Sequence, residues 1–176
     1  MDKYSVLKQY FGHRGFRQGQ EDLVDCLLSG RDVLGVMPTG GGKSVCYQVP
    51  ALLLPGITLV VSPLISLMKD QVMALTRAGV PAAYLNSSLS PAQMATVYRR
   101  MAAGAYKIIY VAPERLESEG FIAAVRNLEL SLLAVDEAHC ISQWGQDFRP
   151  SYRKIPLFLS LLPRRPVVGA FTATAT

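Results

Sequence analysis

The sequence predicts one α/β domain built on a parallel β-sheet with helices on both faces. One observation is a series of short runs rich in Val, Ile and Leu, which suit strands that are covered on both faces. A second is that segments with helical spacing separate these runs, so that strands and helices alternate along the chain. A third is that 176 residues, 50% hydrophobic and 18% charged, can fill one sizeable core and argue against disorder.

Six apolar runs are predicted as strands, with right-handed helical crossovers between them. The runs are Val33–Met37, Thr58–Ser62, Ala82–Leu85, Ile108–Val111, Leu132–Val135 and Val167–Phe171. A helix over residues 64–78 is expected to end at Gly79, because glycine readily adopts the left-handed conformation that stops a helix. Ser90 is expected to cap the next helix, with Pro91 at its first position and Gln93 completing a capping box.

Charge, cysteine content and hydropathy limit the classes of function. A net charge of +5 is compatible with a polyanionic partner, although scattered Lys and Arg residues also suit an ordinary solvated surface. The three cysteines Cys26, Cys46 and Cys140 cannot all pair and form no CxxC pattern, which favours small buried thiols over disulfides or zinc. The sequence shows no signal peptide and no apolar run long enough to cross a bilayer, so a cytoplasmic location is expected.

A glycine-rich segment after the first predicted strand indicates phosphate binding. Residues 37–44 read Met-Pro-Thr-Gly-Gly-Gly-Lys-Ser and precede a helix, which is the context that a P-loop needs. Lys43 is expected to reach the β- and γ-phosphates of a nucleotide, and the Ser44 hydroxyl to bind Mg²⁺. The rest of the cradle is expected to be Thr39, Gly40, Gly41 and Gly42. Pro50 is expected to end or kink the helix that follows.

An acidic pair follows the fifth predicted strand. Asp136 and Glu137 stand at its carboxyl end, where open α/β sheets bind ligands. We expect Asp136 to hold Mg²⁺ and Glu137 to orient and deprotonate the attacking water. Alone, the pair is as typical of a solvated helix start, but the P-loop makes hydrolysis the better interpretation. His139, two residues on, either couples the nucleotide state to motion or simply packs.

These motifs, with others in the same order, resemble the first RecA-like motor domain of RecQ-family DNA helicases in superfamily 2. The further matching segments are residues 16–20, 61–71, 112–116, 140–152 and 172–174. The P-loop also looks like that of superfamily 2, with Met37 where the strict pattern has Gly. The resemblance implies a RecA-like P-loop NTPase domain over residues 1–176, apparently truncated after motif III and without the second RecA-like domain.

The resemblance assigns the adenine side of the nucleotide to residues 13–20. It implies that Gln20 hydrogen-bonds the adenine edge, that Arg17 supports the base or the phosphates, and that His13 lies against the ring. A side-chain amide has both a donor and an acceptor with which to read adenine. The alternative is that Gln20 is an ordinary surface residue at the start of a helix.

The resemblance also assigns a DNA-binding and coupling surface. By analogy with the family's motifs, the candidates there are Ser62, Asn86, Ser88, Arg115, Thr172 and Thr174. The segment after His139 resembles the aromatic-rich loop of RecQ helicases, in which Trp144 and Phe148 would stack on unpaired bases and Arg149 would attract phosphate. The alternative is that both aromatic residues are core residues beneath a loop.

The function that the resemblance implies is that of an ATP-dependent 3′–5′ DNA helicase motor that acts in repair or recombination. ATP and Mg²⁺ would be its cofactors, single-stranded and partly duplex DNA its partner, and a bacterial source would make it nucleoid-associated. A second RecA-like domain would supply the arginine finger, so the 176 residues alone are not expected to unwind DNA. The alternatives are a DEAD- or DEAH-type RNA helicase domain and a non-catalytic nucleotide- or DNA-binding module.

Overall fold

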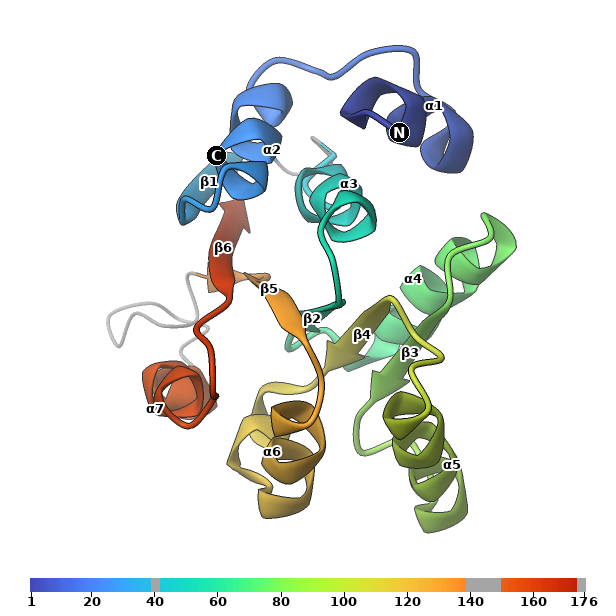
Figure 1. Ribbon diagram of the computed structural model, residues 1–176, viewed down its shortest axis with the longest axis vertical. Helices are drawn as coiled ribbons and strands as arrows, with labels where there is room; N and C mark the ends of the chain where they lie inside the picture. The colour runs from blue at the N-terminus through green and yellow to red at the C-terminus, as the bar shows by residue number, and fades with distance from the viewer. Residues whose placement is uncertain (39–41, 139–149, 174–176) are drawn as a thin grey trace.

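The computed structural model describes residues 1–38, 42–138 and 150–173, and it confirms the α/β class (Figure 1). Within these residues one sheet has six strands in the order β1-β6-β5-β2-β4-β3. All neighbouring strands pair in parallel. The strands are β1 Val33–Met37, β2 Ile57–Val61, β3 Ala82–Leu85, β4 Ile108–Val111, β5 Leu130–Val135 and β6 Val167–Ala173.

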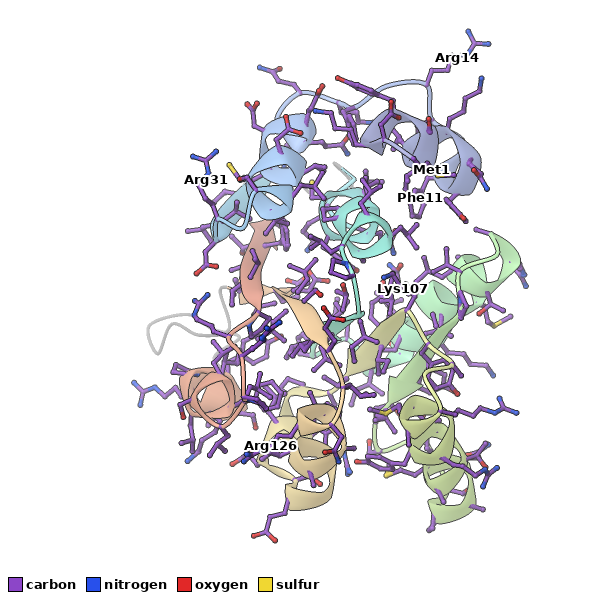
Figure 2. All side chains as sticks on the ribbon, in the orientation of Figure 1. Met1, Phe11, Arg14, Arg31, Lys107 and Arg126 are labelled. Atoms are coloured by element: carbon purple, nitrogen blue, oxygen red, sulfur yellow. The ribbon has the colours of Figure 1, made fainter. Side chains whose placement is uncertain are left out.

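Helices cover both faces of the sheet, as the alternation of strands and helices predicted (Figure 1). The helices are α1 Lys3–Phe11, α2 Gln20–Leu28, α3 Val45–Leu53, α4 Ile65–Arg77, α5 Pro91–Ala102, α6 Glu119–Arg126 and α7 Ile155–Ser160. Two 3₁₀ turns, η1 Pro113–Glu117 and η3 Pro150–Lys154, lie before α6 and α7. Figure 2 shows side chains from strands and helices converging between these layers.

Two apolar clusters fill the space on either side of the sheet. One packs Leu27 of α2, Tyr47 of α3 and Met68 of α4 against strand residues. The other packs Phe121 of α6 and Phe158 of α7 against the opposite face. Because both faces are buried, the central strand β2 is buried at each of its five positions, which explains its uninterrupted apolar sequence.

The predicted element boundaries agree with the structure to within two residues. The capping box at Ser90 and Gln93 is present, and Gly79 follows α4 with a φ of 90°. Of the two effects expected of Pro50, an end to the helix is excluded, since α3 continues to Leu53, while a kink stays a prediction. Proline lacks the N–H that would bond the carbonyl of Cys46, but burial of the flanking turns in the core holds the helix together.

Gly56 is a point where backbone geometry leaves no room for a side chain. It joins α3 to β2 with a φ of 71°, and a Cβ there would overlap the carbonyl oxygen of Glu129. That carbonyl accepts a hydrogen bond from the N–H of Ile57 at 2.8 Å, and the carbonyl of Gly56 accepts one from Lys107 Nζ at 2.7 Å (Lys107 is labelled in Figure 2). Close approach at Gly56 therefore sets the start of the pairing between β2 and β5.

Gly56→Ala is expected to lower the free energy of unfolding by about 3 kcal/mol, the sum of left-handed strain and steric overlap with backbone. Gly104→Ala is the matched control, because Gly104 has a φ of 75° and only open space where a methyl group would stand. The control is expected to cost only about 1 kcal/mol. Urea denaturation monitored by circular dichroism measures both values, and equal midpoints for the two variants would refute this account of Gly56.

Candidate active site

The P-loop and the acidic pair meet at the carboxyl edge of the sheet. The loop follows β1, the acidic pair follows β5, and β6 separates these two strands. Lys43 Nζ lies 3.0 Å from Asp136 Oδ1 and 2.9 Å from Glu137 Oε1. All three side chains are about four-fifths buried, so one cation and two carboxylates form a compact cluster that still opens to solvent.

The charge state of Lys43 follows from this cluster. Burial acts to lower the pKa of its ammonium group, but the neighbouring Asp136 and Glu137 outweigh burial and leave that pKa above its ordinary value of 10.5. Lys43 is therefore charged at neutral pH. On the alkaline side, the stability that comes from the charge of Lys43 is fully present up to pH 10.5 and is lost as the pH rises through the raised pKa.

The backbone around the acidic pair is held by several hydrogen bonds. The N–H of Asp136 donates to the carbonyl of Val61 at 2.8 Å, and the N–H of Glu137 donates to Asp136 Oδ1 at 3.0 Å. Tyr152, which no sequence pattern singled out as a site residue, donates its hydroxyl to the carbonyl of Asp136 at 2.8 Å. Glu137 has a φ of 55°, a conformation that non-glycine residues adopt rarely and that often marks a functional site.

Of the cradle residues, the structure describes Gly42, Lys43 and Ser44, while Thr39, Gly40 and Gly41 lie outside the described residues. Ser44 stands at the N-terminus of α3, where the positive end of the helix dipole favours an anion. Gly42 has a φ of 76°, and a Cβ there would overlap the side-chain amide of Gln20. The glycine is thus required both by its own conformation and by the close approach of Gln20.

The proposed adenine-binding residues lie beside the P-loop. Gln20 is buried, with an exposed fraction of 4%, so the alternative interpretation that it is an ordinary surface residue is wrong. Its Oε1 accepts from the N–H of Arg17 at 2.7 Å, and its Nε2 donates to the carbonyl of Gly42 at 3.0 Å. His13 and Arg17, both exposed, line a cavity of about 190 Å³ together with Gln20 and Gly42.

A second cavity, of about 400 Å³, extends from the cluster of Lys43, Asp136 and Glu137 toward α4. Lys43, Asp136 and Glu137 lie on one side of it. Its other lining residues include Tyr47, Ser62, Leu67, Met68, Gln71 and Tyr110. The cavity therefore joins the residues expected to handle phosphate to the segment that carries the first of the DNA-binding candidates.

The DNA-binding candidates stand at the carboxyl ends of three adjacent strands, after β2, β3 and β4. Ser62 is buried, and its Oγ accepts from the N–H of Leu64 at 3.2 Å. Asn86 is only 1% exposed, and its Oδ1 accepts from the N–H of Ser88 at 2.8 Å. In this conformation Asn86 shapes the turn, whereas Ser88 is exposed and Arg115 is partly exposed.

The remaining coupling candidates are only partly described. Thr172 lies on β6 in register with Val36 of β1, close to the strand that leads into the P-loop, and it is partly buried. The residues His139, Trp144, Phe148, Arg149 and Thr174 lie outside the described residues. Tyr152, at the end of the aromatic-rich segment, is buried and contacts the Asp136 backbone.

Within residues 1–38, 42–138 and 150–173, the side chains that could bind a metal do not cluster by themselves. No group of three or more His, Cys, Asp and Glu side chains in the described part of the chain could hold a metal ion. Among the same residues, no helix is long and apolar enough to cross a membrane. Cys46 is buried, as predicted, whereas Cys26 is only partly buried and Cys140 lies outside the described residues. Burial raises the pKa of the Cys46 thiol to about 11, so it stays protonated at neutral pH.

Known proteins with similar sequences include several DNA helicases. The chain is 51% identical over 173 residues to the ATP-dependent DNA helicase RecQ of Bacillus subtilis (strain 168), across 98% of this chain and 29% of that protein. It is 48% identical over 170 residues to RecQ of Pasteurella multocida (strain Pm70), across 97% of this chain and 27% of that protein. The chain thus spans less than a third of the length of these curated relatives.

Solved structures with the same fold include two helicases of lower sequence identity. The DNA-bound DUF1998 helicase MrfA superposes with a TM-score of 0.77 at 20% identity, covering 100% of this chain and 27% of that one. A hypothetical ATP-dependent RNA helicase from Sulfolobus tokodaii superposes with a TM-score of 0.73 at 22% identity, covering 98% of this chain and 50% of that one. At such identities the likeness shows a shared fold.

Most of the chain also matches a known protein family. Residues 17–176 match the DEAD/DEAH box helicase family, a range that contains the P-loop, the acidic pair and all six strands. The chain therefore belongs to the DEAD/DEAH box helicase family, and over nearly its whole length it is similar to RecQ-type ATP-dependent DNA helicases.

Proposed function

We propose that this chain is the first RecA-like domain of a RecQ-type DNA helicase, which binds Mg-ATP and couples its hydrolysis to 3′–5′ movement on single-stranded DNA and duplex unwinding in repair or recombination. The observation that carries the proposal is the cluster of Lys43, Asp136 and Glu137 at the carboxyl edge of the sheet. Phosphoryl transfer needs mainly positioning and charge neutralisation, and this cluster offers a cation, a metal-binding carboxylate and a base.

The site residues have oxygen ligands that fit a magnesium ion. The Ser44 hydroxyl and the Asp136 carboxylate are hard oxygen donors, and Mg²⁺ in such sites takes one or two protein ligands with the nucleotide phosphates. When bound, the ion would neutralise charge on the β- and γ-phosphates. Lys43 would then leave its two carboxylates to meet the phosphates, freeing Glu137 to orient the attacking water and accept its proton.

The adenine contact is compatible with the hydrogen bonds that Gln20 already makes. An amide group carries both donors and acceptors, and two of the hydrogen bonds of Gln20 tie it to the N–H of Arg17 and the carbonyl of Gly42. Gln20 lines the same cavity as His13 and Arg17, which brings its amide to the space proposed for the edge of adenine. Gln20 would then hold the base and the P-loop carbonyl of Gly42 together.

The DNA strand would lie along the ends of β2, β3 and β4. Ser88 and Arg115 have the exposure needed to reach phosphates, and Ser62 and Asn86 would position the backbone N–H groups of their turns. Trp144, Phe148 and Arg149 remain candidates for base stacking and phosphate attraction on the loop after the acidic pair. His139, Thr172 and Thr174 remain candidates for coupling the two sites.

A comparison of single-stranded DNA with RNA of the same sequence tests this proposal against an RNA helicase. The full-length protein that carries this chain is expected to hydrolyse ATP at least about tenfold faster with saturating DNA than with RNA. The 176-residue chain alone is expected to separate no duplex, because the second RecA-like domain completes the site. Stronger stimulation by RNA would favour the RNA helicase alternative, and absence of hydrolysis would favour a non-catalytic module.

A further inference from the structure

A chain of buried polar groups runs from the P-loop helix to α4. The hydroxyl groups of Tyr47 on α3 and Tyr110 on β4 lie 2.9 Å apart. Gln48, also on α3, donates from Nε2 to the Tyr110 hydroxyl at 3.0 Å, and the same Nε2 lies 3.5 Å from Gln71 Oε1 on α4. Tyr110 therefore stands at the centre of a connection between two helices on the same face of the sheet.

One end of this chain reaches the nucleotide site. Ser44, the proposed magnesium ligand, lies one helical turn before Tyr47, and its carbonyl accepts a hydrogen bond from the N–H of Tyr47 at 3.2 Å. Ser44, Tyr47, Tyr110 and Asp136 all line the 400 Å³ cavity beside the catalytic cluster. A change in what Ser44 and Asp136 bind therefore alters the hydrogen-bonding and electrostatic surroundings of the tyrosine pair.

The other end reaches the segment that faces the proposed DNA strand. Gln71 lies two turns into α4, the helix that begins just after Ser62 and Leu64. At the start of this helix the side chains of Leu64 and Leu67 are 38% and 49% exposed. The helix is therefore attached to the sheet through its opposite, buried face, where Met68 packs in the core. The contact between Gln48 and Gln71 is part of that attachment.

Stability alone does not require hydroxyl groups at these positions. Tyr47 and Tyr110 are 1% and 2% exposed, and their neighbours in the same cluster include Leu27, Met68 and Phe171. Burying a polar group gives little net stability even when it is hydrogen-bonded, and it costs about 1–3 kcal/mol when a partner is lost. Phenylalanine would fill the same space without that risk, so the hydroxyl pair indicates a role in positioning.

We propose that Tyr110 is a positioning residue that links occupancy of the nucleotide site at Ser44 and Asp136 to the placement of α4 and its DNA-facing start. The proposal rests on the proposed function, because it assumes that Mg-ATP and DNA bind at those two places. Binding at Ser44 and Asp136 would change the surroundings of the Tyr47 hydroxyl in the shared cavity, and Tyr110 would pass that change through Gln48 to Gln71. Coupling of this kind is reciprocal, so DNA would also change the affinity for nucleotide.

The test measures the affinity of the full-length protein for single-stranded DNA, with and without a saturating non-hydrolysable Mg-ATP analogue. The ratio of the two dissociation constants is the coupling factor. We expect at least about fivefold coupling in the wild type, and less than about twofold coupling in Tyr110→Phe. A uniform loss of DNA affinity leaves this ratio unchanged, so a merely structural defect does not mimic the expected result.

Tyr84→Phe is the matched control. Tyr84 lies on β3 directly in register with Tyr110, and the variant removes a hydroxyl from the neighbouring strand of the same sheet. Its coupling factor is expected to equal that of the wild type. Gln71→Leu provides a second variant at the outer end of the chain, in case Tyr110→Phe does not fold, and it is expected to lose coupling in the same way.

The outcomes separate the two proposals. A wild-type protein that binds no DNA or no nucleotide contradicts the proposed function itself. A coupled wild type with a coupling factor retained in Tyr110→Phe, or in Gln71→Leu when the first variant is unfolded, overturns the positioning role. Equal loss of coupling in Tyr84→Phe overturns it as well, because the effect would then follow from any hydroxyl removed from these strands.

Discussion

Replacement of Glu137 by glutamine is expected to reduce the DNA-stimulated rate of ATP hydrolysis by about 10³-fold, because the amide cannot accept a proton from the attacking water. Nucleotide binding is expected to persist. Gln has nearly the same shape as Glu, and the variant removes one of the two carboxylates that hold Lys43 at 2.9–3.0 Å. Lys43 then meets the phosphates against less competition, so the affinity for Mg-ATP stays equal to the wild type or increases.

Steady-state hydrolysis and equilibrium nucleotide binding by the full-length protein measure these two effects separately. Glu119→Gln is the control, because Glu119 is an exposed residue at the start of α6 on the opposite face of the sheet from α3. The control is expected to leave both quantities unchanged. If Glu137→Gln kept more than a tenth of the wild-type rate, Glu137 would not be the base.

Replacement of Lys43 by alanine is expected to weaken binding of a Mg-ATP analogue by at least about 10²-fold. Loss of one partner from a partly buried charge pair commonly costs about 2–5 kcal/mol, and each 1.4 kcal/mol is a factor of ten in affinity. The variant also leaves Asp136 and Glu137 close together without their shared cation. A lower melting temperature is therefore expected along with the loss of binding.

The double variant Lys43→Ala with Glu137→Gln separates these consequences. Removing one carboxylate relieves the repulsion around Asp136, so the melting temperature should recover toward that of the wild type. Nucleotide binding should not recover, because the cation that meets the phosphates is still missing. Calorimetric titration and thermal denaturation measure the two quantities, and recovery of binding in the double variant would show that Lys43 acts only through stability.

The sequence predicted the elements and the nucleotide site because both depend on local patterns. Apolar runs such as Ile57–Val61 are readable because burial on both faces removes polar positions from the strand. The glycine-rich turn and the acidic pair could be predicted because phosphate binding and hydrolysis each need fixed residue types at fixed spacing. Lys43 contacts Asp136 and Glu137, which follow it by 93 and 94 residues in the sequence. The two motifs meet because the strands that precede them end at the same edge of the sheet.

Other features depend on contacts between distant segments and were not readable from local patterns. The strand order places β6, the last strand, between β1 and β5, and alternation along the chain does not specify that order. The burial of Asn86, the second role of Gln20 on the P-loop, and the pairing of Tyr47 with Tyr110 all require knowledge of which helix covers which strand. Pro50 does not end its helix, because tertiary packing overrides that local effect.

The most direct test of the account is a calorimetric titration of a non-hydrolysable Mg-ATP analogue into this chain, repeated in the presence of the corresponding GTP analogue. We expect binding at one site that requires Mg²⁺ and Lys43, and that the GTP analogue displaces only at much higher concentration, because Gln20 is placed to read adenine. Failure of a folded chain to bind, or equal binding of the two nucleotides, would contradict the assignment of this sheet edge as an adenine nucleotide site.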